Sequence, residues 1–343
     1  MLLPTRPILT VDPLFPDPDD AHQIVALAHR FGRYRVYGEA EQVDLDLGRG
    51  LFPRHDSVQN FLRTGGARGT GATPGALAAR TSYFREEYAY GGQEHIGGMD
   101  GFLHNPALIG AAVALFDRPV IEPAIAFANL MLPGQELAVH TDVPEFRGVS
   151  RKNLPQWLLV VMHHSGLFDA WRLAIATGIA YFQDLDTGAL RSWPHGPDAE
   201  PSRQPVRANT AVVLDTDSVF HGVDPVGPGS DAPRLTTGTT LVAAPDGRWT
   251  LTHPDGEVAG RFEWDDMRFS VSWKAYCFVD EGARETWRHQ TDDLTVDVIV
   301  DRLVDDLAER GLVTPEVPRD PDLGLLLIDH YVRFPATTGW SAP

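Results

Sequence analysis

Residues 132–148, LPGQELAVHTDVPEFRG, hold the pattern on which the predicted fold and the predicted function both depend. The run ELAVHTDV is short and is bounded by Gly and Pro, as is typical of a β-strand. Side chains two positions apart on a strand point to the same face, so His140 and Asp142 would present an imidazole and a carboxylate side by side. Residues 211–223, AVVLDTDSVFHGV, place His221 just after a second predicted strand.

These three side chains form the sequence pattern of a 2-His-1-carboxylate site. A His-x-Asp followed by a distant His is typical of non-haem Fe(II) enzymes, in which three protein ligands occupy one face of the metal. The opposite face then offers three open positions for a bidentate cosubstrate and dioxygen. We therefore expect His140, Asp142 and His221 to be the catalytic metal ligands. The alternative is that they are unrelated, because the chain has 13 histidines.

Around this pattern the chain changes from helical to strand-rich and back again. Periodicity and capping residues predict helices over 18–32 and 105–117, and a C-terminal helix ending at Gly311. Between about 120 and 280, short apolar runs alternate with Gly, Pro and Asp turns, which is typical of a jelly roll. The predicted strands include QWLLVVMHH (156–164), RLTTGTTLV (234–242) and RFSVSWKAYCF (268–278), and WRLAIA (171–176) is interpreted as a short helix.

We therefore predict a mainly β fold with flanking helices. Residues 1–119 would be an N-terminal region of helices and loops, 120–280 the β core, and 281–343 a C-terminal helical extension. Within the core, RWTLTHPDGEVAGRFEW (248–264) is interpreted as an inserted hairpin that turns at Asp255-Gly256. The tail after Gly311 is rich in proline and has one apolar patch, which we expect to dock on the body.

The pattern resembles the Fe(II)/2-oxoglutarate-dependent oxygenases, whose core is a double-stranded β-helix, a cupin-like jelly roll. The resemblance covers roughly residues 120–280. It implies that His140, Asp142 and His221 hold Fe(II), with 2-oxoglutarate as cosubstrate and dioxygen as oxidant. The implied reaction is hydroxylation, desaturation or cyclisation of a small-molecule substrate, with release of succinate and CO2. In related halogenases a small residue replaces the carboxylate ligand, so Asp142 argues against halogenation.

The resemblance also implies a basic residue that binds the distal carboxylate of 2-oxoglutarate, often as Arg-x-Ser on the last core strand. Arg234 lies at the usual family distance, thirteen residues after His221, whereas Arg268 lies much further along. We favour Arg268 with Ser270, because alternation over 268–278 places them on one polar face of a half-buried strand. Arg234 is the alternative. An arginine fork matches a carboxylate with two parallel hydrogen bonds.

Other polar segments receive ordinary structural interpretations, each with a functional alternative. His163 and His164 follow a predicted strand, so one of them would point inward as a core histidine or approach the site. His195 lies in a turn from which it could touch the substrate. Residues 80–92, RTSYFREEYAYGG, are expected to pack, or else to close over a polar substrate. The Gly-rich residues 64–76 lack the ending of a phosphate loop and are expected to be a flexible loop or a lid.

Composition excludes several classes of protein. The 343 residues carry 29 basic and 47 acidic side chains, a net charge of −18, which disfavours binding to nucleic acid or anionic membranes. The single cysteine rules out a disulfide framework and Cys-rich metal sites. The start of the chain does not resemble a signal peptide, and we expect a cytoplasmic protein without a membrane span. The alternatives left open are an iron oxidase that does not use 2-oxoglutarate and a non-catalytic cupin-like binding module.

Overall fold

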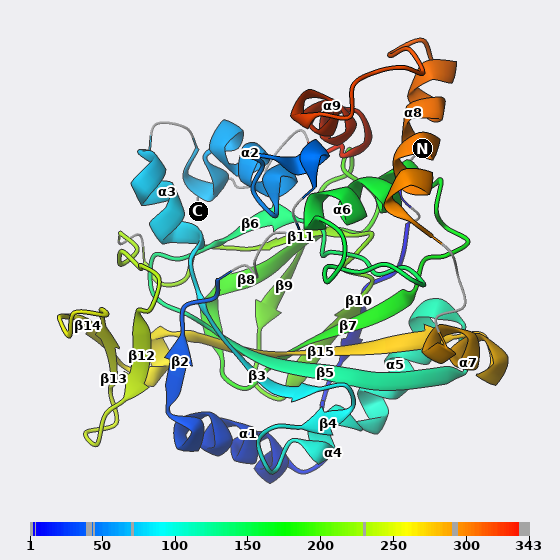
Figure 1. Cartoon of the computed structure of the whole chain (residues 1–343). Coiled ribbons are helices and arrows are strands. Elements are labelled where there is room, and N and C mark those ends of the chain that lie inside the picture. The colour runs from blue at the N-terminus through cyan, green and yellow to red at the C-terminus, as the bar shows by residue number, and fades with distance from the viewer. Residues whose placement is uncertain are drawn as a thin grey trace.

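Three antiparallel sheets form the body of the protein. The structure is a computed structural model, and it describes residues 3, 5–38, 43, 45–69, 72–228, 231–289 and 294–335. The largest sheet has seven strands in the order β1-β10-β7-β15-β5-β3-β4. They are β1 (Leu9–Val11), β10 (Thr210–Leu214), β7 (Ala174–Tyr181), β15 (Arg268–Phe278), β5 (Val120–Met131), β3 (Phe84–Tyr90) and β4 (Gln93–Glu94). Figure 1 shows β15 and β5 running side by side across the middle of this sheet.

A second sheet of four strands faces the first. Its order is β6-β11-β8-β9, with β6 (Leu137–His140), β11 (Phe220–Val223), β8 (Leu185–Trp193) and β9 (Ser202–Val206). From β5 onward the chain passes between the two sheets: β5, β7, β10 and β15 join the first, and β6, β8, β9 and β11 join the second. This alternation is the winding of a double-stranded β-helix, and it confirms the predicted jelly-roll core.

The third sheet is a peripheral ribbon in the order β14-β13-β12-β2. Its strands are β14 (Val258–Phe262), β13 (Trp249–Thr252), β12 (Thr240–Ala243) and β2 (Arg33–Arg35). The predicted hairpin at Asp255-Gly256 is present, because β13 pairs with β14 across that turn. The strand predicted over 234–242 is only partly correct, since the chain turns at Thr236–Thr239 before β12 begins.

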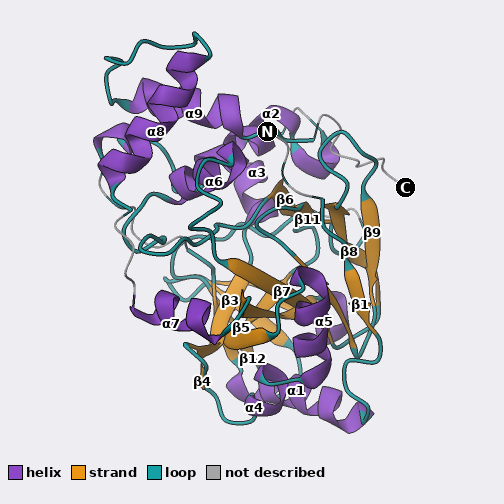
Figure 2. Ribbon diagram, turned by 90° about the vertical axis from the view of Figure 1, so that its right-hand side faces the viewer, coloured by secondary structure: helices purple, strands orange, loops and turns teal. Residues whose placement is uncertain are grey.

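Helices cover both ends of the β core, as Figure 2 shows. At one end lie α1 (Pro18–Phe31) and α4 (Asp100–Leu103), and α5 (Pro106–Phe116) packs on the outer face of the large sheet. At the other end lie α2 (His55–Thr64), α3 (Pro74–Thr81), α6 (Gln156–Ser165), α8 (Val296–Glu309) and α9 (Pro321–Tyr331), and α7 (Glu281–His289) follows β15. The predicted helices over 18–32 and 105–117 are confirmed, with Asp17 and Asn105 as N-caps. The C-terminal tail docks as α9.

The strand predicted over 156–164 is wrong, because this segment is helix α6. All ten of its residues are buried, beneath α8 and α9. An apolar run buried on every side has no periodicity that distinguishes a strand from a helix. The helix has Pro155 at its N-cap position and ends at Gly166, which is in the left-handed conformation (φ 71°). The short helix predicted over 171–176 is also wrong, since Ala174 begins strand β7.

The large sheet has two chemically different faces. On β15, the outer positions 269, 271, 273, 275 and 277 are buried and apolar, and they pack toward α5. Trp273 is fully buried there and donates its indole N–H to the Leu103 carbonyl oxygen at 2.7 Å. The inner positions are polar and face a cavity between the two sheets. The alternation predicted for 268–278 is therefore confirmed.

None of the described helices has both the length and the apolar character needed to cross a membrane.

The close approach of β11 to β6 requires a residue without a side chain at Gly222. A Cβ at this position would lie 2.7 Å from the Leu137 carbonyl oxygen, which is backbone and cannot rotate away. We expect Gly222→Ala to lower the free energy of unfolding by about 1–3 kcal/mol in urea titrations, since the two strands must separate. The matched control is Gly110→Ala on the exposed face of α5, where a Cβ meets open space. That change should raise stability by about 0.5–1 kcal/mol; equal effects of the two changes would contradict the close approach.

Candidate functional site

The second sheet brings the three predicted metal ligands together. His140 ends β6 and pairs directly with His221 on β11, so that both imidazoles project from the same face. Their ring centroids lie 4.4 Å apart. Asp142 follows His140 by two residues, and its Oδ1 lies 3.5 Å from His140 Nε2 and 3.8 Å from His221 Nε2. One ligand atom from each residue falls within 4.8 Å of the others.

Backbone carbonyl groups determine which nitrogen each imidazole offers. His140 Nδ1 lies 2.7 Å from the Ala138 oxygen, and His221 Nδ1 lies 2.9 Å from the Val219 oxygen. A carbonyl oxygen can only accept, so each Nδ1 carries the proton and each Nε2 lone pair faces Asp142. A hydrogen bond of this kind orients the imidazoles of metal sites. The ligand atoms are slightly further apart than the ~3 Å expected for neighbouring ligands at ~2.1 Å from one ion.

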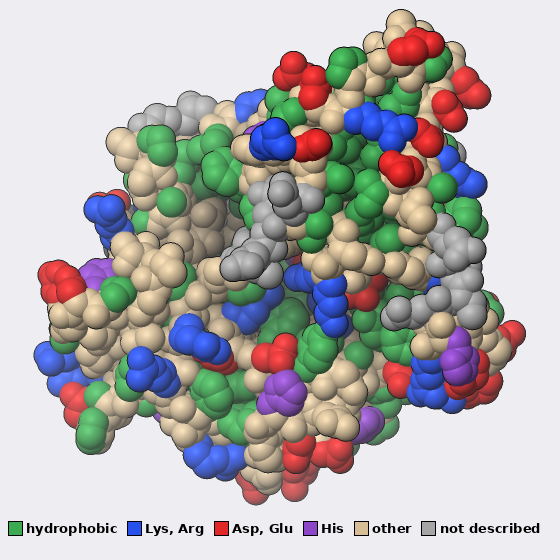
Figure 3. Space-filling view, viewed as in Figure 1, with side chains coloured by type: hydrophobic (Ala, Val, Ile, Leu, Met, Phe, Trp, Pro, Cys, Tyr) green, Lys and Arg blue, Asp and Glu red, His purple; other side chains and the backbone are tan. Residues whose placement is uncertain are grey.

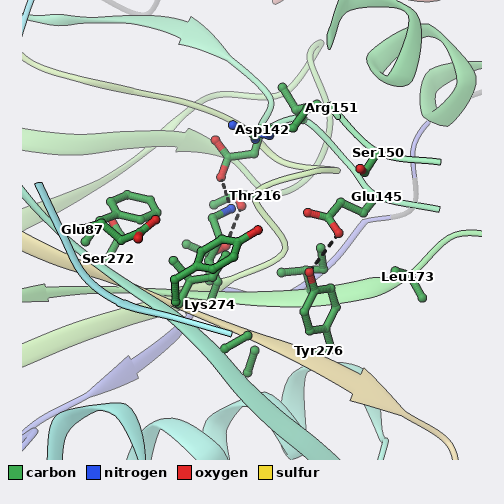
Figure 4. A pocket seen from close by; sticks show the side chains of 18 of the residues that line it. Glu87, Asp142, Glu145, Ser150, Arg151, Leu173, Thr216, Ser272, Lys274 and Tyr276 are labelled. Carbon is green, nitrogen blue, oxygen red and sulfur yellow. Dashed lines mark hydrogen bonds and ion pairs between the residues drawn. The ribbon is translucent and has the colours of Figure 1, made fainter. Parts of the chain in front are cut away.

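Lys274 on β15 contacts the other oxygen of Asp142. Its Nζ donates to Asp142 Oδ2 at 2.6 Å, and Figure 4 shows the lysine reaching the carboxylate from the opposite sheet. Burial opposes ionisation of this carboxylate, but Lys274, with the two histidines, outweighs burial and holds the pKa of Asp142 well below its usual range. Burial and the neighbouring His140 lower the pKa of His221 to about 4. Near neutral pH the set is therefore an anionic carboxylate with His221 neutral, which metal binding requires.

A cavity of about 1150 Å³ opens in front of these residues. Its floor is the inner face of the large sheet, and Figure 3 shows the hollow with basic side chains at its opening. Apolar side chains such as Phe127, Ile125 and Ile179 line much of the wall. Deeply apolar clefts with a few convergent polar groups are the usual form of small-molecule sites.

Arg268 lies in the same cavity and is 3% exposed. Its Nε donates to the Gly188 carbonyl oxygen at 2.8 Å, and one terminal nitrogen donates to Ser270 Oγ at 3.0 Å. The guanidinium also lies over the Tyr181 ring, 5.2 Å from its centroid. Gly188 is needed for this placement, because a Cβ there would lie 2.8 Å from Arg268 Cδ. Among the described residues, no carboxylate lies within 4 Å of the Arg268 guanidinium.

Arg234 is not brought to this cavity. It is exposed, in a segment without regular structure, and does not line the cavity wall. His195 is exposed in a turn and is likewise outside the cavity. His163 and His164 lie on α6 rather than after a strand, and neither lines the cavity. His164 Nε2 instead lies 3.2 Å from Oγ1 of Thr141, the residue between the first two triad members.

The sequence did not assign one contact of the site, and it left the 80–92 segment open between packing and closing over a substrate. Lys274 was placed on the polar face of β15, but its contact with Asp142 depends on how the two sheets face each other. In the 80–92 segment, Tyr83 and Arg85 reach the cavity, whereas Arg80 is buried against Glu136 and Tyr88 against Tyr34. The alternation of β3 is visible in the sequence, yet its pairing with β5 is not, since nothing local specifies the partner strand.

Comparisons with known proteins give only distant likenesses. No protein-family model and no curated sequence matches the chain. A prolyl-4-hydroxylase from Pseudomonas putida is 13% identical, with a TM-score of 0.37 over 80% of this chain and 94% of that one. A prolyl hydroxylase in complex with a hypoxia inducible factor peptide, from Trichoplax adhaerens, is 10% identical, with a TM-score of 0.41 over 84% and 89%. HygX from Streptomyces hygroscopicus, with nickel, 2-oxoglutarate and hygromycin B bound, is 10% identical, with a TM-score of 0.38 over 80% and 84%.

His164 behind the site makes stability depend on pH. Burial lowers the pKa of His164 to about 4, whereas an unfolded histidine titrates near 6.5. The unfolded chain therefore binds more protons between these values, and the free energy of unfolding falls as the pH drops from about 6.5 toward 4. For this group the loss at pH 5 is about 2 kcal/mol.

Urea titrations at pH 7 and pH 5 measure this loss. His164→Gln should shrink the difference in unfolding free energy between the two pH values by about 2 kcal/mol, because glutamine does not titrate. The control is His104→Gln, at a side chain that is 49% exposed, which should leave the difference unchanged. If His164→Gln leaves it unchanged as well, His164 is not buried in its neutral form.

Proposed function

We propose that this protein is an Fe(II)- and 2-oxoglutarate-dependent oxygenase that acts on a small molecule. One observation carries the proposal: a single cavity contains both a facial set of two imidazoles and one carboxylate and a buried arginine with no described carboxylate near it. A metal set alone would suit many enzymes and binding proteins. A buried cation without a counter-ion is unfavourable unless an anionic ligand neutralises it.

The donor set suits Fe(II) among the common metals. Two imidazoles and a carboxylate from His140, Asp142 and His221 are the ligand types of a non-haem iron site with open positions. A structural zinc site would use four protein ligands, and no fourth His, Cys, Asp or Glu joins this group among the described residues. When bound, the iron would supply the activation of dioxygen.

Arg268 and Ser270 would bind the distal carboxylate of 2-oxoglutarate. The guanidinium is already held by the Gly188 carbonyl group, the Ser270 hydroxyl and the Tyr181 ring, so little conformational entropy is lost on binding. A planar fork pairs with a carboxylate through two parallel hydrogen bonds. The keto-acid end of the cosubstrate would then face the triad across the cavity.

The remaining residues of the site have orienting and protective roles in this proposal. The Ala138 and Val219 carbonyl groups keep the protons on Nδ1, and Lys274 keeps Asp142 ionised with one oxygen directed toward the imidazoles. Apolar walls limit water around the reacting groups. Hydroxylation is the proposed reaction, with desaturation or cyclisation as variants, and succinate and CO2 as the products of the cosubstrate.

The decisive measurement is anaerobic titration of the Fe(II)-loaded protein with 2-oxoglutarate, following the weak visible charge-transfer band of the chelate. Arg268→Gln should weaken 2-oxoglutarate about 10- to 100-fold, since losing a charged hydrogen-bond partner costs about 1.5–3 kcal/mol. Arg234→Gln, at the exposed arginine outside the cavity, is the matched control and should leave the titration unchanged. His221→Ala should abolish the band by removing a metal ligand.

Three other results would redirect the assignment. Iron binding through the triad without a band would favour an oxidase that does not use 2-oxoglutarate. A titration weakened by Arg234→Gln and unaffected by Arg268→Gln would move the anchor to Arg234. Failure to bind Fe(II) at all would leave the core as a binding module and would refute the enzyme proposal.

A further inference from the structure

A second arginine, Arg85 on β3, projects into the same cavity. In the large sheet Arg85 pairs with Asn129 on β5, and Asn129 pairs with Ser270 on β15. Directly paired residues share a face, so these side chains form one row across the cavity floor. Neighbouring strands lie about 4.8 Å apart, which places the Arg85 backbone roughly 10 Å from that of Ser270. Arg85 therefore occupies the side of the cavity away from the proposed 2-oxoglutarate anchor.

Aromatic rings enclose the faces of the Arg85 guanidinium. Its central carbon lies 4.0 Å from the ring centroid of Phe127, 4.2 Å from that of Tyr37 and 5.3 Å from that of Tyr83. Its Nε donates to Asn129 Oδ1 at 3.0 Å. These contacts fix the side chain and remove water from its faces, which strengthens a charge-assisted bond at its edge.

Among the described residues, the edge of this guanidinium has no acceptor. Within the described ranges, neither terminal nitrogen of Arg85 donates a hydrogen bond to protein, and no carboxylate lies within 4 Å of it. A fork of this kind presents two parallel N–H donors, which is the geometry that a carboxylate or a phosphate accepts.

The acidic side chains that line the cavity, within the part of the chain that the structure describes, already have other partners. Glu122 pairs with Arg288 at 2.9 Å, Glu145 accepts from the Tyr276 hydroxyl at 2.9 Å, and Glu87 pairs with His95 at 3.0 Å. Figure 4 shows the Tyr276–Glu145 pair on the cavity wall, away from Lys274. None of these carboxylates neutralises Arg85.

The cations of the cavity can be compared with the anions that the proposed function supplies. Lys274 is neutralised by Asp142, and Arg268 would be neutralised by the distal carboxylate of 2-oxoglutarate. Arg151 and Lys152 line the cavity but are exposed, so water solvates them. Arg85 is the half-buried cation for which the triad and the cosubstrate leave no anion.

We propose that Arg85 binds an anionic group, a carboxylate or a phosphate, of the substrate. The inference rests on the proposed function, because it takes the cavity to be the place where the substrate meets the metal and 2-oxoglutarate. The aromatic rings around Arg85 would pack against the part of the substrate that carries the charge. The substrate class is therefore a small organic acid or phosphate ester rather than a neutral or cationic molecule.

Calorimetric titration of the Ni(II)- and 2-oxoglutarate-loaded protein tests this binding without turnover. The probes are acetate and benzoate, inorganic phosphate and phenyl phosphate, and neutral benzyl alcohol. We expect at least one anion to bind at least tenfold more tightly than benzyl alcohol. Tighter binding of acetate and benzoate would indicate a carboxylate site, and tighter binding of inorganic phosphate and phenyl phosphate would indicate a phosphate site. Arg85→Gln should weaken that anion at least tenfold, and Arg85→Lys should retain part of the affinity because it keeps the charge without the fork.

The controls separate this inference from the proposed function. Arg33→Gln, at an exposed arginine on β2 outside the cavity, should leave the affinity of every probe unchanged. Arg85→Gln should keep wild-type 2-oxoglutarate binding and the wild-type thermal unfolding temperature. Arg268→Gln should weaken 2-oxoglutarate binding, while the affinity of the probe should still depend on Arg85.

Several outcomes would overturn the role of Arg85. These are anion affinities unchanged by Arg85→Gln, no anion binding to the wild-type protein, or loss of 2-oxoglutarate instead of the probe in Arg85→Gln. If nickel and 2-oxoglutarate fail to bind, the proposed function fails. Titration of the metal-free protein with the same probes then still decides whether Arg85 binds an anion.

Discussion

The register between β6 and β11 is the constraint on which the rest of the site depends. These two strands have four residues each, yet they place His140 directly opposite His221. Gly222 allows the strands to approach closely, and the Asp142 N–H donates to the Thr216 oxygen at 2.8 Å, which holds the third proposed ligand in place. A shift of one residue would turn His221 to the other face of the sheet, away from His140 and Asp142. All four residues of β11 are buried, which disfavours such a shift.

Strand β15 connects the stability of the fold to the electrostatics of the site. Its outer face is a continuous apolar surface packed under α5, and its inner face presents Arg268, Ser270, Ser272 and Lys274 to the cavity. Charged groups in a partly dehydrated cavity are unfavourable unless they are paired. Lys274 is paired with Asp142, whereas Arg268 has only neutral hydrogen-bond partners among the described residues. The apolar packing on the outer face offsets this unfavourable inner face, so the fold can keep the buried cation that the proposed function assigns to 2-oxoglutarate.

Local patterns predicted those parts of the fold that have a clear period or a clear start and turn. Helix α1 with its one apolar face, helix α5 with its Asn105-Pro106 start, the hairpin at Asp255-Gly256 and the alternation along β15 could all be predicted from spacing, caps and turn residues. Segment 156–165 could not, because it is buried on every side and an all-apolar run has no periodicity. The sequence offered contact of residues 80–92 with a polar substrate only as an alternative to packing, and it could not single out Arg85 for the role proposed above. That role depends on β3 joining β5, a pairing between residues some forty positions apart that no local pattern encodes.

By itself, the sequence determined that Arg268, Ser270 and Lys274 share a face of β15, whereas Asp142 lies two residues beyond the end of β6 and is not placed by strand alternation. The physical reason is that a strand directs alternate side chains to opposite sides whatever surrounds it. Only the tertiary structure decided that Arg268 rather than Arg234 lies in the cavity with the triad, and that Lys274 contacts Asp142. Both facts depend on how the chain winds between two facing sheets. Lys274 and Asp142 are more than a hundred positions apart in the sequence. Contacts over such a separation are determined by the burial of whole strands and not by the residues next to them in the chain.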